Sequence, residues 1–231
     1  MDKPLKDWTL GALHKGGTKM NINEFAKEVH ANACEKGWWD EERSFGDIIA
    51  LCHSELSEAL EEFRAGRPMV WYSCTEIQPF HQCDPKDSFD CQMYGKEECC
   101  KYLGKKPEGI AVELCDCIIR ILDWMGKEGI NPEDYLKKDI VDSAMLAFDM
   151  PSTICKGNWG DIVAELHLYL SLAYRNWLNG AGYYSIVTRM ALAIWRIQEW
   201  AQEVGVDMET ILRTKHEYNK TRPYRHGGKA L

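Results

Sequence analysis

The sequence predicts an all-α protein, and three observations carry that prediction. Apolar residues recur at helical spacing over long stretches, and no stretch shows the strict alternation that is typical of a half-buried strand. The 231 residues are 45% hydrophobic and include nine Trp and ten Tyr, so the chain can bury a substantial core. We therefore expect a helical bundle whose helices pack through their apolar faces.

Helical periodicity predicts seven elements, taken here in chain order. They cover residues 22–36, 45–65, 109–127, 139–147, 160–179, 185–204 and 207–218. Gly66 and Pro68 follow the second element, and residues of these types commonly end a helix. The element 109–127 is apolar almost all round, which predicts that it is buried.

The chain contains an internal repeat. GDIIALCHSELSEALEEFR at 46–64 matches GDIVAELHLYLSLAYRNWL at 160–178, and a weaker match links 110–130 with 186–206. Two-helix units often repeat because neither buries its apolar face alone, whereas chance similarity of amphipathic helices is the alternative. We predict an internal pseudo-dimer of two units, 1–138 and 139–231. The first unit carries an insert at about 69–105.

Charge and composition argue against several classes of partner. The formal net charge of −8 disfavours a general affinity for nucleic acid or acidic membranes. No run reaches the ~20 apolar residues that a membrane-spanning helix needs, and the N-terminal stretch lacks the apolar core of a signal peptide. We expect a cytoplasmic protein whose ten cysteines stay as thiols or bind metal.

Acidic residues border the apolar stripe of the predicted helix 45–65. On a helical wheel Glu55 is flanked by apolar residues on both sides, and Glu58 and Glu62 border the same stripe. Glu61 lies on the opposite, solvated side. This pattern raises the question of what the inward-facing carboxylates bind.

A second acidic stripe runs along the predicted helix 109–127. Glu113, Asp116, Arg120 and Asp123 lie together on an otherwise apolar cylinder. Burying unpaired carboxylates costs several kcal/mol each, so two inward acidic stripes repel unless a cation lies between them. The alternative is an acidic surface with i, i+4 partners such as Asp116 and Arg120.

The acidic residues form two pairs with i, i+3 spacing, which places both carboxylates of a pair on one helix face. Oxygen-only ligation suits Mg²⁺ or Mn²⁺. The predicted metal ligands are Glu55, Glu58, Glu113 and Asp116. The sequence has no phosphate-binding GxxxxGK[ST] loop, no GxGxxG after a strand and no GxSxG, so those reaction classes are disfavoured.

At these residues the sequence resembles the MazG-like, all-α nucleoside triphosphate pyrophosphohydrolases. The family signature is two helical acidic motifs, ExxE and ExxD, which here are residues 55–58 and 113–116. The flanking stretches GWWDEERSFGDIIALCHSELSEALEEFRAGRP and KPEGIAVELCDCIIRILDWMGKEGI and the tail KHEYNKTRPYRHGGKAL also look like the family.

The resemblance implies Mg²⁺-dependent hydrolysis of nucleoside triphosphates to the monophosphate and pyrophosphate, in a role that cleans nucleotide pools. Related alternatives are a pyrophosphatase specific for dUTP or for phosphoribosyl-ATP. An alternative from another class is a non-catalytic protein that senses nucleotide. A nucleotide is then the expected partner, and we also expect a homodimer.

The sequence departs from the family in three respects. Ser54 stands where the family often has a further glutamate, and the insert separates the acidic motifs more widely than usual. The second copy has lost the acids, because the matching positions hold Tyr169, Leu172, Arg189 and Leu192. We interpret it as a degenerate partner that completes the bundle. The family tail follows this second copy, and we expect it to reach back to the first.

Further residues are assigned roles by position and resemblance. A carboxylate beside the metal could take a proton from the attacking water, and the candidates are Glu58 and Glu62. Aromatic residues before the first acidic helix could stack on a base, with Trp39 favoured over Trp38. The predicted substrate-binding residues are Lys36, Trp39, Arg120, Lys215, Asn219 and Arg222.

The insert is rich in cysteine. Four of its thiolates, or three of them with a histidine, could hold a structural Zn²⁺, although the spacing contains no CxxC pair. The alternative is a loose lid with free thiols. The candidate ligands are Cys74, His81, Cys83, Cys91, Cys99 and Cys100.

Overall fold

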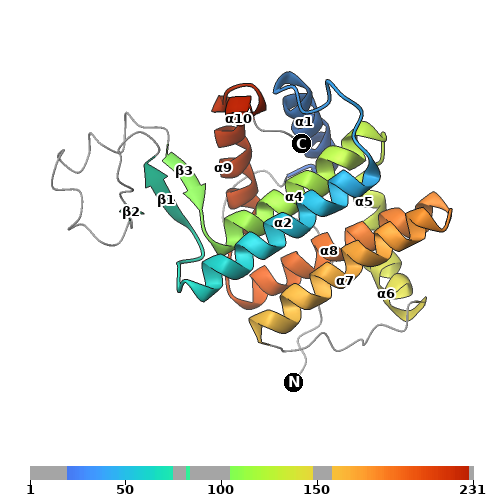
Figure 1. Ribbon diagram of the computed structural model, residues 1–231. Helices are drawn as coiled ribbons and strands as arrows, with labels where there is room; N and C mark the ends of the chain where they lie inside the picture. Colours follow the sequence, from blue (N-terminus) through green and yellow to red (C-terminus); the bar gives the residue numbers. More distant parts are fainter. Residues whose placement is uncertain (1–19, 75–81, 84–104, 148–157, 229–231) are drawn as a thin grey trace.

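The computed structural model describes residues 20–74, 82–83, 105–147 and 158–228 (Figure 1). Over these residues the chain is predominantly helical, which confirms the all-α class. The helices are α1 (Ile22–Glu35), α2 (Phe45–Arg64), α4 (Ile110–Lys127), α5 (Pro132–Tyr135), α6 (Lys138–Ala147), α7 (Trp159–Leu178), α8 (Tyr183–Glu203), α9 (Met208–Thr221) and α10 (Arg225–Gly228). In the described part of the chain, no helix combines the length and the apolar character that crossing a membrane requires.

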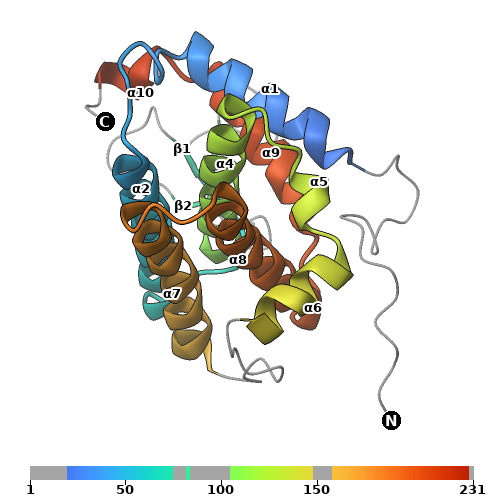
Figure 2. The same ribbon diagram turned by 90° about the vertical axis from the view of Figure 1, so that its right-hand side faces the viewer.

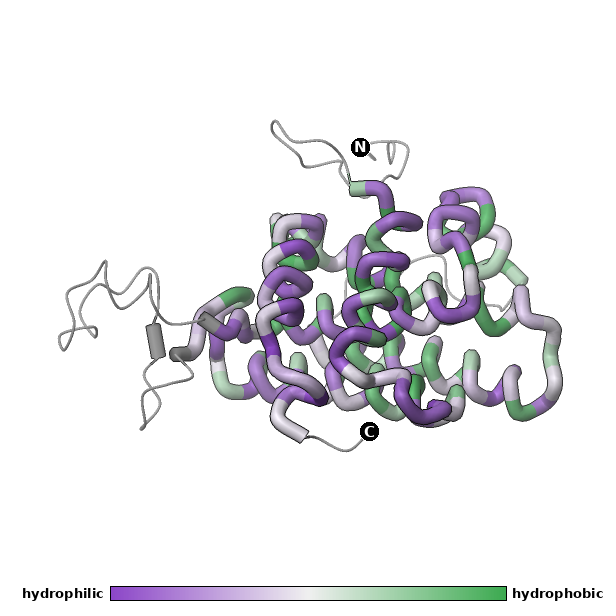
Figure 3. Tube along the Cα trace, turned by 90° about the horizontal axis from the view of Figure 1, so that it is seen from above, coloured by the Kyte–Doolittle hydropathy of each residue, from purple (hydrophilic) through white to green (hydrophobic). Residues whose placement is uncertain are grey.

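Two helix pairs form the centre of the bundle. Helix α2 packs on α4, α7 packs on α8, and α2 lies beside α7 (Figure 2). Helix α4 also contacts α1 and α9, so it is covered on several sides, as its apolar sequence predicts. Hydrophobic and hydrophilic residues alternate along the helices, as expected when one face of each lies in the core (Figure 3). One hydrophobic core extends through both predicted units.

Side-chain caps fix where α2 and α7, the two helices of the stronger internal match, begin. Ser44 and Asp47 form a reciprocal capping box at the start of α2, and Asn158 accepts from the backbone N–H of Asp161 at the start of α7. These contacts satisfy backbone N–H groups that have no partner within the helix. The predicted bounds of the seven helices agree with the structure to within a few residues.

A small antiparallel sheet was not predicted from the sequence. Its strands are β1 (Trp71–Cys74), β2 (Gln82–Cys83) and β3 (Lys105–Glu108), in the order β2-β1-β3. Trp71 pairs with Glu108 and Cys74 with Lys105, so the two ends of the predicted insert lie side by side. The sheet projects from the bundle (Figure 1). This pairing keeps α2 and α4 adjacent despite the long connection between them.

Gly109 permits the close approach of the chain between β3 and α4. Its φ of 113° lies in a region that side chains rarely adopt, and a Cβ there would lie 2.8 Å from the carbonyl oxygens of Pro68 and Met69. The backbone N–H of Ala111 donates to the carbonyl of Met69 at 3.0 Å. Glycine is therefore required where the segment after α2, at Pro68 and Met69, approaches the start of α4.

His53 on α2 and His167 on α7 meet directly at the contact between the two helices. Their Nδ1 atoms lie 2.6 Å apart, the ring centroids lie 4.9 Å apart and the planes differ by 14°. Nearly parallel planes and this short Nδ1–Nδ1 contact mean that one ring donates N–H to the lone pair of the other. The pair can therefore hold one shared proton but not a proton on each Nδ1.

Acidification is expected to destabilise the fold through this pair. Burial lowers the pKa of both imidazoles, and the charge of His167 lowers that of His53 further. The unfolded chain therefore binds protons first, and the stability present above the unfolded pKa is lost as the pH falls below about 6.5. Urea unfolding at neutral and at acidic pH measures how much the free energy of unfolding falls on acidification. In the double variant His53→Gln/His167→Gln this fall should be about 1 kcal/mol smaller than in the unmodified protein, which is the size of one hydrogen bond. Equal losses in both proteins would contradict this.

Candidate metal and nucleotide site

Three carboxylates converge between α2 and α4. Glu55 comes from the middle of α2, and Glu113 and Asp116 come from the start of α4. One oxygen of each lies within 4.8 Å of the others. Glu55 and Glu113 are buried, with 6% and 5% of their surface exposed. Carboxylate oxygens in such a group fit a hard divalent cation, which Mg²⁺ and Mn²⁺ exemplify.

Two cationic side chains neutralise these carboxylates. Arg120 donates its Nε–H to Glu55 Oε1 at 3.0 Å. Lys215 is only 2% exposed, and its Nζ lies 2.8 Å from Asp116 Oδ2. The sequence predicts both cations as substrate contacts. In the structure they pair with predicted metal ligands, because a buried carboxylate without a partner costs several kcal/mol.

Burial and mutual repulsion raise the pKa values of the two glutamates. Burial is the largest cause for Glu113, followed by the charge of Asp116, and its pKa rises to about 9. The same two causes raise the pKa of Glu55 to about 7, against the opposing charge of Arg120. Burial disfavours the charge of Lys215, yet Asp116 and Glu113 outweigh it and raise its pKa to about 12. At neutral pH the cluster therefore keeps Glu113 protonated beside a charged lysine.

Metal binding is expected to release protons. A carboxylate that ligates a cation must be ionised, and Glu113, with a pKa of about 9, is protonated at neutral pH. The affinity for Mg²⁺ should therefore rise at least about tenfold per pH unit from neutral pH toward the pKa of Glu113, with at least about one proton released per ion, because Glu55, with a pKa of about 7, is also partly protonated. Calorimetric titration in buffers of different ionisation enthalpy measures this number. A heat of binding that is independent of the buffer would contradict the prediction.

Glu58 and Glu62 lie outside the group of converging oxygens. Glu58 is exposed and accepts a hydrogen bond from the hydroxyl of Ser54 at 3.1 Å. Glu62 accepts from the indole N–H of Trp71 at 2.6 Å. The structure thus brings together three of the four predicted metal ligands. The i, i+3 spacing leaves Glu58 on the same helix face as Glu55, but its side chain turns to Ser54 and toward solvent.

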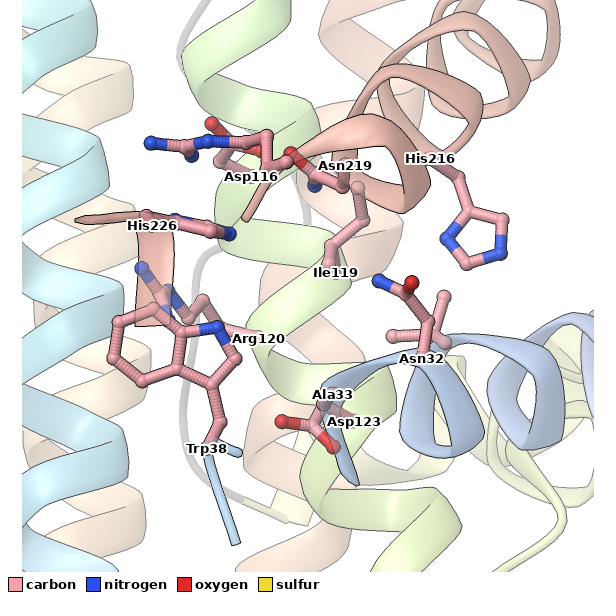
Figure 4. Close-up of a pocket in the computed structure, with 12 residues that line it drawn as sticks. Asn32, Ala33, Trp38, Asp116, Ile119, Arg120, Asp123, His216, Asn219 and His226 are labelled. Atoms are coloured by element: carbon pink, nitrogen blue, oxygen red, sulfur yellow. The ribbon is translucent and has the colours of Figure 1, made fainter. Parts of the chain in front are cut away.

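A pocket opens beside the carboxylates, and Asp116 and Arg120 form part of its wall. This pocket is partly open to solvent. Trp38 and His226 lie on one side, with Asn32 and His216 on the other (Figure 4). The full lining consists of Val29, Asn32, Ala33, Trp38, Asp116, Ile119, Arg120, Asp123, His216, Asn219, Arg222 and His226.

Several polar atoms of this pocket have no hydrogen-bond partner among the described residues. They are Oδ1 of Asn32, Nε2 of His216 and Oδ1 of Asn219, and all three atoms are buried. His216 is 2% exposed, and burial is the main cause that lowers its pKa. Buried polar groups without partners are rare in folded proteins. A bound molecule with complementary polar groups would satisfy them.

Trp38 lines the pocket, whereas Trp39, which the sequence favours as a base-stacking residue, does not. Trp39 is turned to α4 and donates its indole N–H to Asp123 at 2.9 Å. The guanidinium of Arg43 lies 4.9 Å from the ring centre of Trp38. Lys36 lies outside the lining, and its Nζ is 3.5 Å from Glu35.

The tail reaches back to the first unit, as the sequence predicts. The backbone N–H of Arg225 donates to the carbonyl of Lys36 at 2.9 Å, and its Nε–H donates to the carbonyl of Gly37 at 3.1 Å. Tyr224 donates its hydroxyl hydrogen to Asp40. A Cβ on Gly37 would lie 2.1 Å from the ring of Tyr224, so glycine allows this docking.

No family model, curated protein or solved structure matches this chain. The resemblance of its acidic motifs to the MazG-like family therefore stays a prediction. The geometry of the cluster and the pocket has to support any function by itself.

Two of the predicted zinc ligands lie on described strands. Cys74 ends β1, and Cys83 in β2 follows Gln82, which pairs with Ser73 of β1. The remaining candidates, His81, Cys91, Cys99 and Cys100, lie outside the described residues. The zinc site stays a prediction, as does the homodimer.

The second unit places a different network where the first has its carboxylates. Tyr169 occupies the position that matches Glu55, and its hydroxyl donates to Glu165 Oε1 at 2.5 Å. Arg196, 1% exposed, donates its Nε–H to Glu165 Oε2 at 2.9 Å. At this place a tyrosine and an arginine contact a single carboxylate, whereas the first unit brings three carboxylates together.

Sequence reasoning missed Asn32, His216 and His226 as pocket residues. His216 and His226 both stand in the tail stretch that the resemblance includes, so their positions in KHEYNKTRPYRHGG were the available signal. Asn32 lies within an ordinary amphipathic pattern. It becomes a wall of the pocket only because α1 packs across α4.

Proposed function

We propose that this protein hydrolyses nucleoside triphosphates to the monophosphate and pyrophosphate. The observation that carries the proposal is the convergence of Glu55, Glu113 and Asp116 beside a polar pocket with an aromatic wall. Such a cluster would hold Mg²⁺ or Mn²⁺, and the adjacent pocket would hold the nucleoside. In this scheme Glu58 completes the ligand set after a change of rotamer.

A bound divalent cation would neutralise the phosphates and lower the pKa of the attacking water. The cationic side chains near the cluster then bind the phosphates of the substrate. Arg120 and Lys215 are held at the carboxylates, and ion binding there frees them to contact phosphate oxygens. Arg222, on the pocket wall, adds a third positive charge. With Glu113 deprotonated, the loaded site carries a net positive charge that attracts a polyphosphate.

The pocket has the features that a nucleobase requires. Trp38 lines the pocket with an aromatic ring, and stacking of a base on such a ring would be worth about 1–3 kcal/mol. The unpartnered amide of Asn219, the amide of Asn32 and the imidazole of His216 can donate to or accept from a base edge. Glu58 and Glu62 remain the candidates for the proton acceptor that activates water. A general base near the metal contributes typically 10²–10⁴-fold.

The tandem architecture is part of the proposal. The His53–His167 contact joins equivalent positions of the two repeats, which supports an internal pseudo-dimer. The second unit would act as the inactive partner. It contributes α9 and the tail, which supply Lys215, Asn219 and Arg222 to the site of the first unit.

A hydrolysis panel tests the function. The purified protein is incubated with each canonical nucleoside and deoxynucleoside triphosphate, with dUTP and with phosphoribosyl-ATP, in Mg²⁺, in Mn²⁺ and in EDTA. Monophosphate and pyrophosphate in equal amounts, formed with metal and absent in EDTA, are the expected result. Release of inorganic phosphate, or turnover that persists in EDTA, would contradict the proposal. The ranking of substrates separates a broad enzyme from one specific for dUTP or phosphoribosyl-ATP.

One observation favours a second candidate, a protein that binds nucleotide without hydrolysing it. Arg120 and Lys215 already satisfy Glu55 and Asp116, so the cluster is stable without a metal ion. Such a protein would bind nucleotide with the same affinity in Mg²⁺ and in EDTA. Calorimetric binding together with no turnover in the panel would favour this sensor.

A further inference from the structure

Four side chains form a hydrogen-bonded chain that the proposed hydrolysis does not use. Asp123 on α4 accepts from the indole N–H of Trp39 at 2.9 Å, and its Oδ1 lies 2.8 Å from Nδ1 of His30 on α1. Nε2 of the same imidazole lies 3.5 Å from Sγ of Cys34, one helical turn further along. The order is therefore carboxylate, imidazole, thiol.

The geometry assigns a proton position to each nitrogen of His30. Asp123 is 7% exposed and accepts only, so Nδ1 carries the hydrogen that it donates to the carboxylate. Nε2 of the neutral ring is then an acceptor, and it faces the thiol of Cys34. The indole of Trp39 holds Asp123 from a second direction, so the carboxylate cannot turn away. A base beside the nucleophile, itself oriented by a third group, is the arrangement that activates nucleophiles in enzymes.

Cys34 differs from the other cysteines whose surroundings the structure describes. It is exposed, whereas Cys52, Cys115 and Cys117 are buried. Burial, followed by the charges of Asp123 and Asp40, raises the pKa of the Cys34 thiol. This direction opposes ionisation of the thiol by itself, so its activation rests on the imidazole nitrogen that lies 3.5 Å from Sγ.

A binding space adjoins the cluster. Asn32 and Ala33, which precede Cys34 on α1, line the pocket together with Asp123. The same pocket contains the buried, unpartnered Nε2 of His216. A small polar molecule held there would lie next to the segment that carries the thiol.

We propose that Cys34 is an activated thiol that forms mixed disulfides with low-molecular-weight disulfides. The thiol proton passes to Nε2 of His30, and the thiolate attacks one sulfur of the disulfide. A bond forms between Sγ and that sulfur as the disulfide bond breaks. The second half leaves as a thiolate and takes the proton from His30. Cys34 is thereby oxidised, and the external disulfide is reduced to one thiol and one bound half.

The test uses the full chain and oxidised glutathione as the probe. Addition of glutathione to each cysteine is followed over time by mass spectrometry of digested peptides, so that every cysteine is scored separately. In the folded variants His30→Gln and Asp123→Asn, Cys34 should react at least about tenfold more slowly than in the folded unmodified protein, because the base is lost or misoriented. Asp134→Asn is the matched control for the aspartate, and His53→Gln is the matched control for the histidine.

A second measurement, on the unmodified protein, still tests the proposal if the variants do not fold. Unfolding in urea exposes every cysteine, so an ordinary buried thiol such as Cys115 reacts faster when the chain unfolds. Cys34 should react more slowly, since unfolding separates it from the oriented imidazole. The proposal is overturned if Cys34 also accelerates on unfolding, or if folded His30→Gln protein reacts at the unmodified rate. These readouts do not depend on nucleotide hydrolysis.

Discussion

Replacing Asp116 by asparagine, or Glu113 by glutamine, is expected to lower nucleotide hydrolysis on the order of 1,000-fold. Both changes keep the shape of the side chain but place an amide, which cannot ionise, where a bound cation needs a carboxylate, among oxygens that lie within 4.8 Å of one another. An amide ligates a divalent cation weakly. The loss should appear mainly in kcat, because the metal acts on the reacting phosphate.

The measurement is steady-state release of pyrophosphate in saturating Mg²⁺ with the best substrate of the panel. Glu61→Gln and Asp134→Asn are matched controls, since each makes the same chemical change at an exposed residue outside the cluster. Both controls should retain activity within about twofold. Full activity in folded Asp116→Asn protein would remove the cluster from the catalytic site.

Replacing Lys215 by methionine is expected to destabilise the metal-free protein by about 3 kcal/mol. Lys215 is 2% exposed and pairs with Asp116 at 2.8 Å, so its removal leaves that carboxylate, next to Glu113, without its cation. This loss lies at the low end of the range for removing one partner of a buried ion pair, because Asp116 is partly open to the pocket. Mg²⁺ should restore much of the loss, since an ion that binds only the folded state stabilises it.

Urea unfolding in EDTA and in Mg²⁺ measures this effect. Arg196→Met is the matched control, because it removes an equally buried cation from Glu165 in the second unit. That variant should also be destabilised, but the increase in stability caused by Mg²⁺ should equal that of the unmodified protein. If Mg²⁺ stabilises both variants equally, Lys215 does not neutralise a metal site.

The carboxylate cluster shows how far sequence reasoning reaches. The i, i+3 spacing and the apolar flanks predicted that Glu55, Glu113 and Asp116 face inward, and they converge. Spacing alone could not decide the rotamer of Glu58, which lies at the border of the same stripe and points to Ser54. Position on a helix fixes the direction of Cα–Cβ, whereas the end of a long side chain depends on its neighbours.

The aromatic pair before α2 shows a second limit. Trp38 and Trp39 are adjacent, and nothing in their composition says which one faces the pocket. The structure turns Trp39 to Asp123 and leaves Trp38 in the wall. This choice depends on the packing of α1 and the tail around the loop, which involves residues far apart in the sequence.

By itself, the sequence determined the helical class, the helix bounds and the inward direction of the acids, because these follow from periodicity, capping residues and local spacing. It also indicated that the tail returns to the first unit. Only the tertiary structure decided that Arg120 and Lys215 pair with the carboxylates and that Asp123 orients the imidazole beside Cys34. Those contacts join α2 to α4, α4 to α9 and α1 to α4. They form because buried charges must find partners, and the partners are chosen by packing between distant segments.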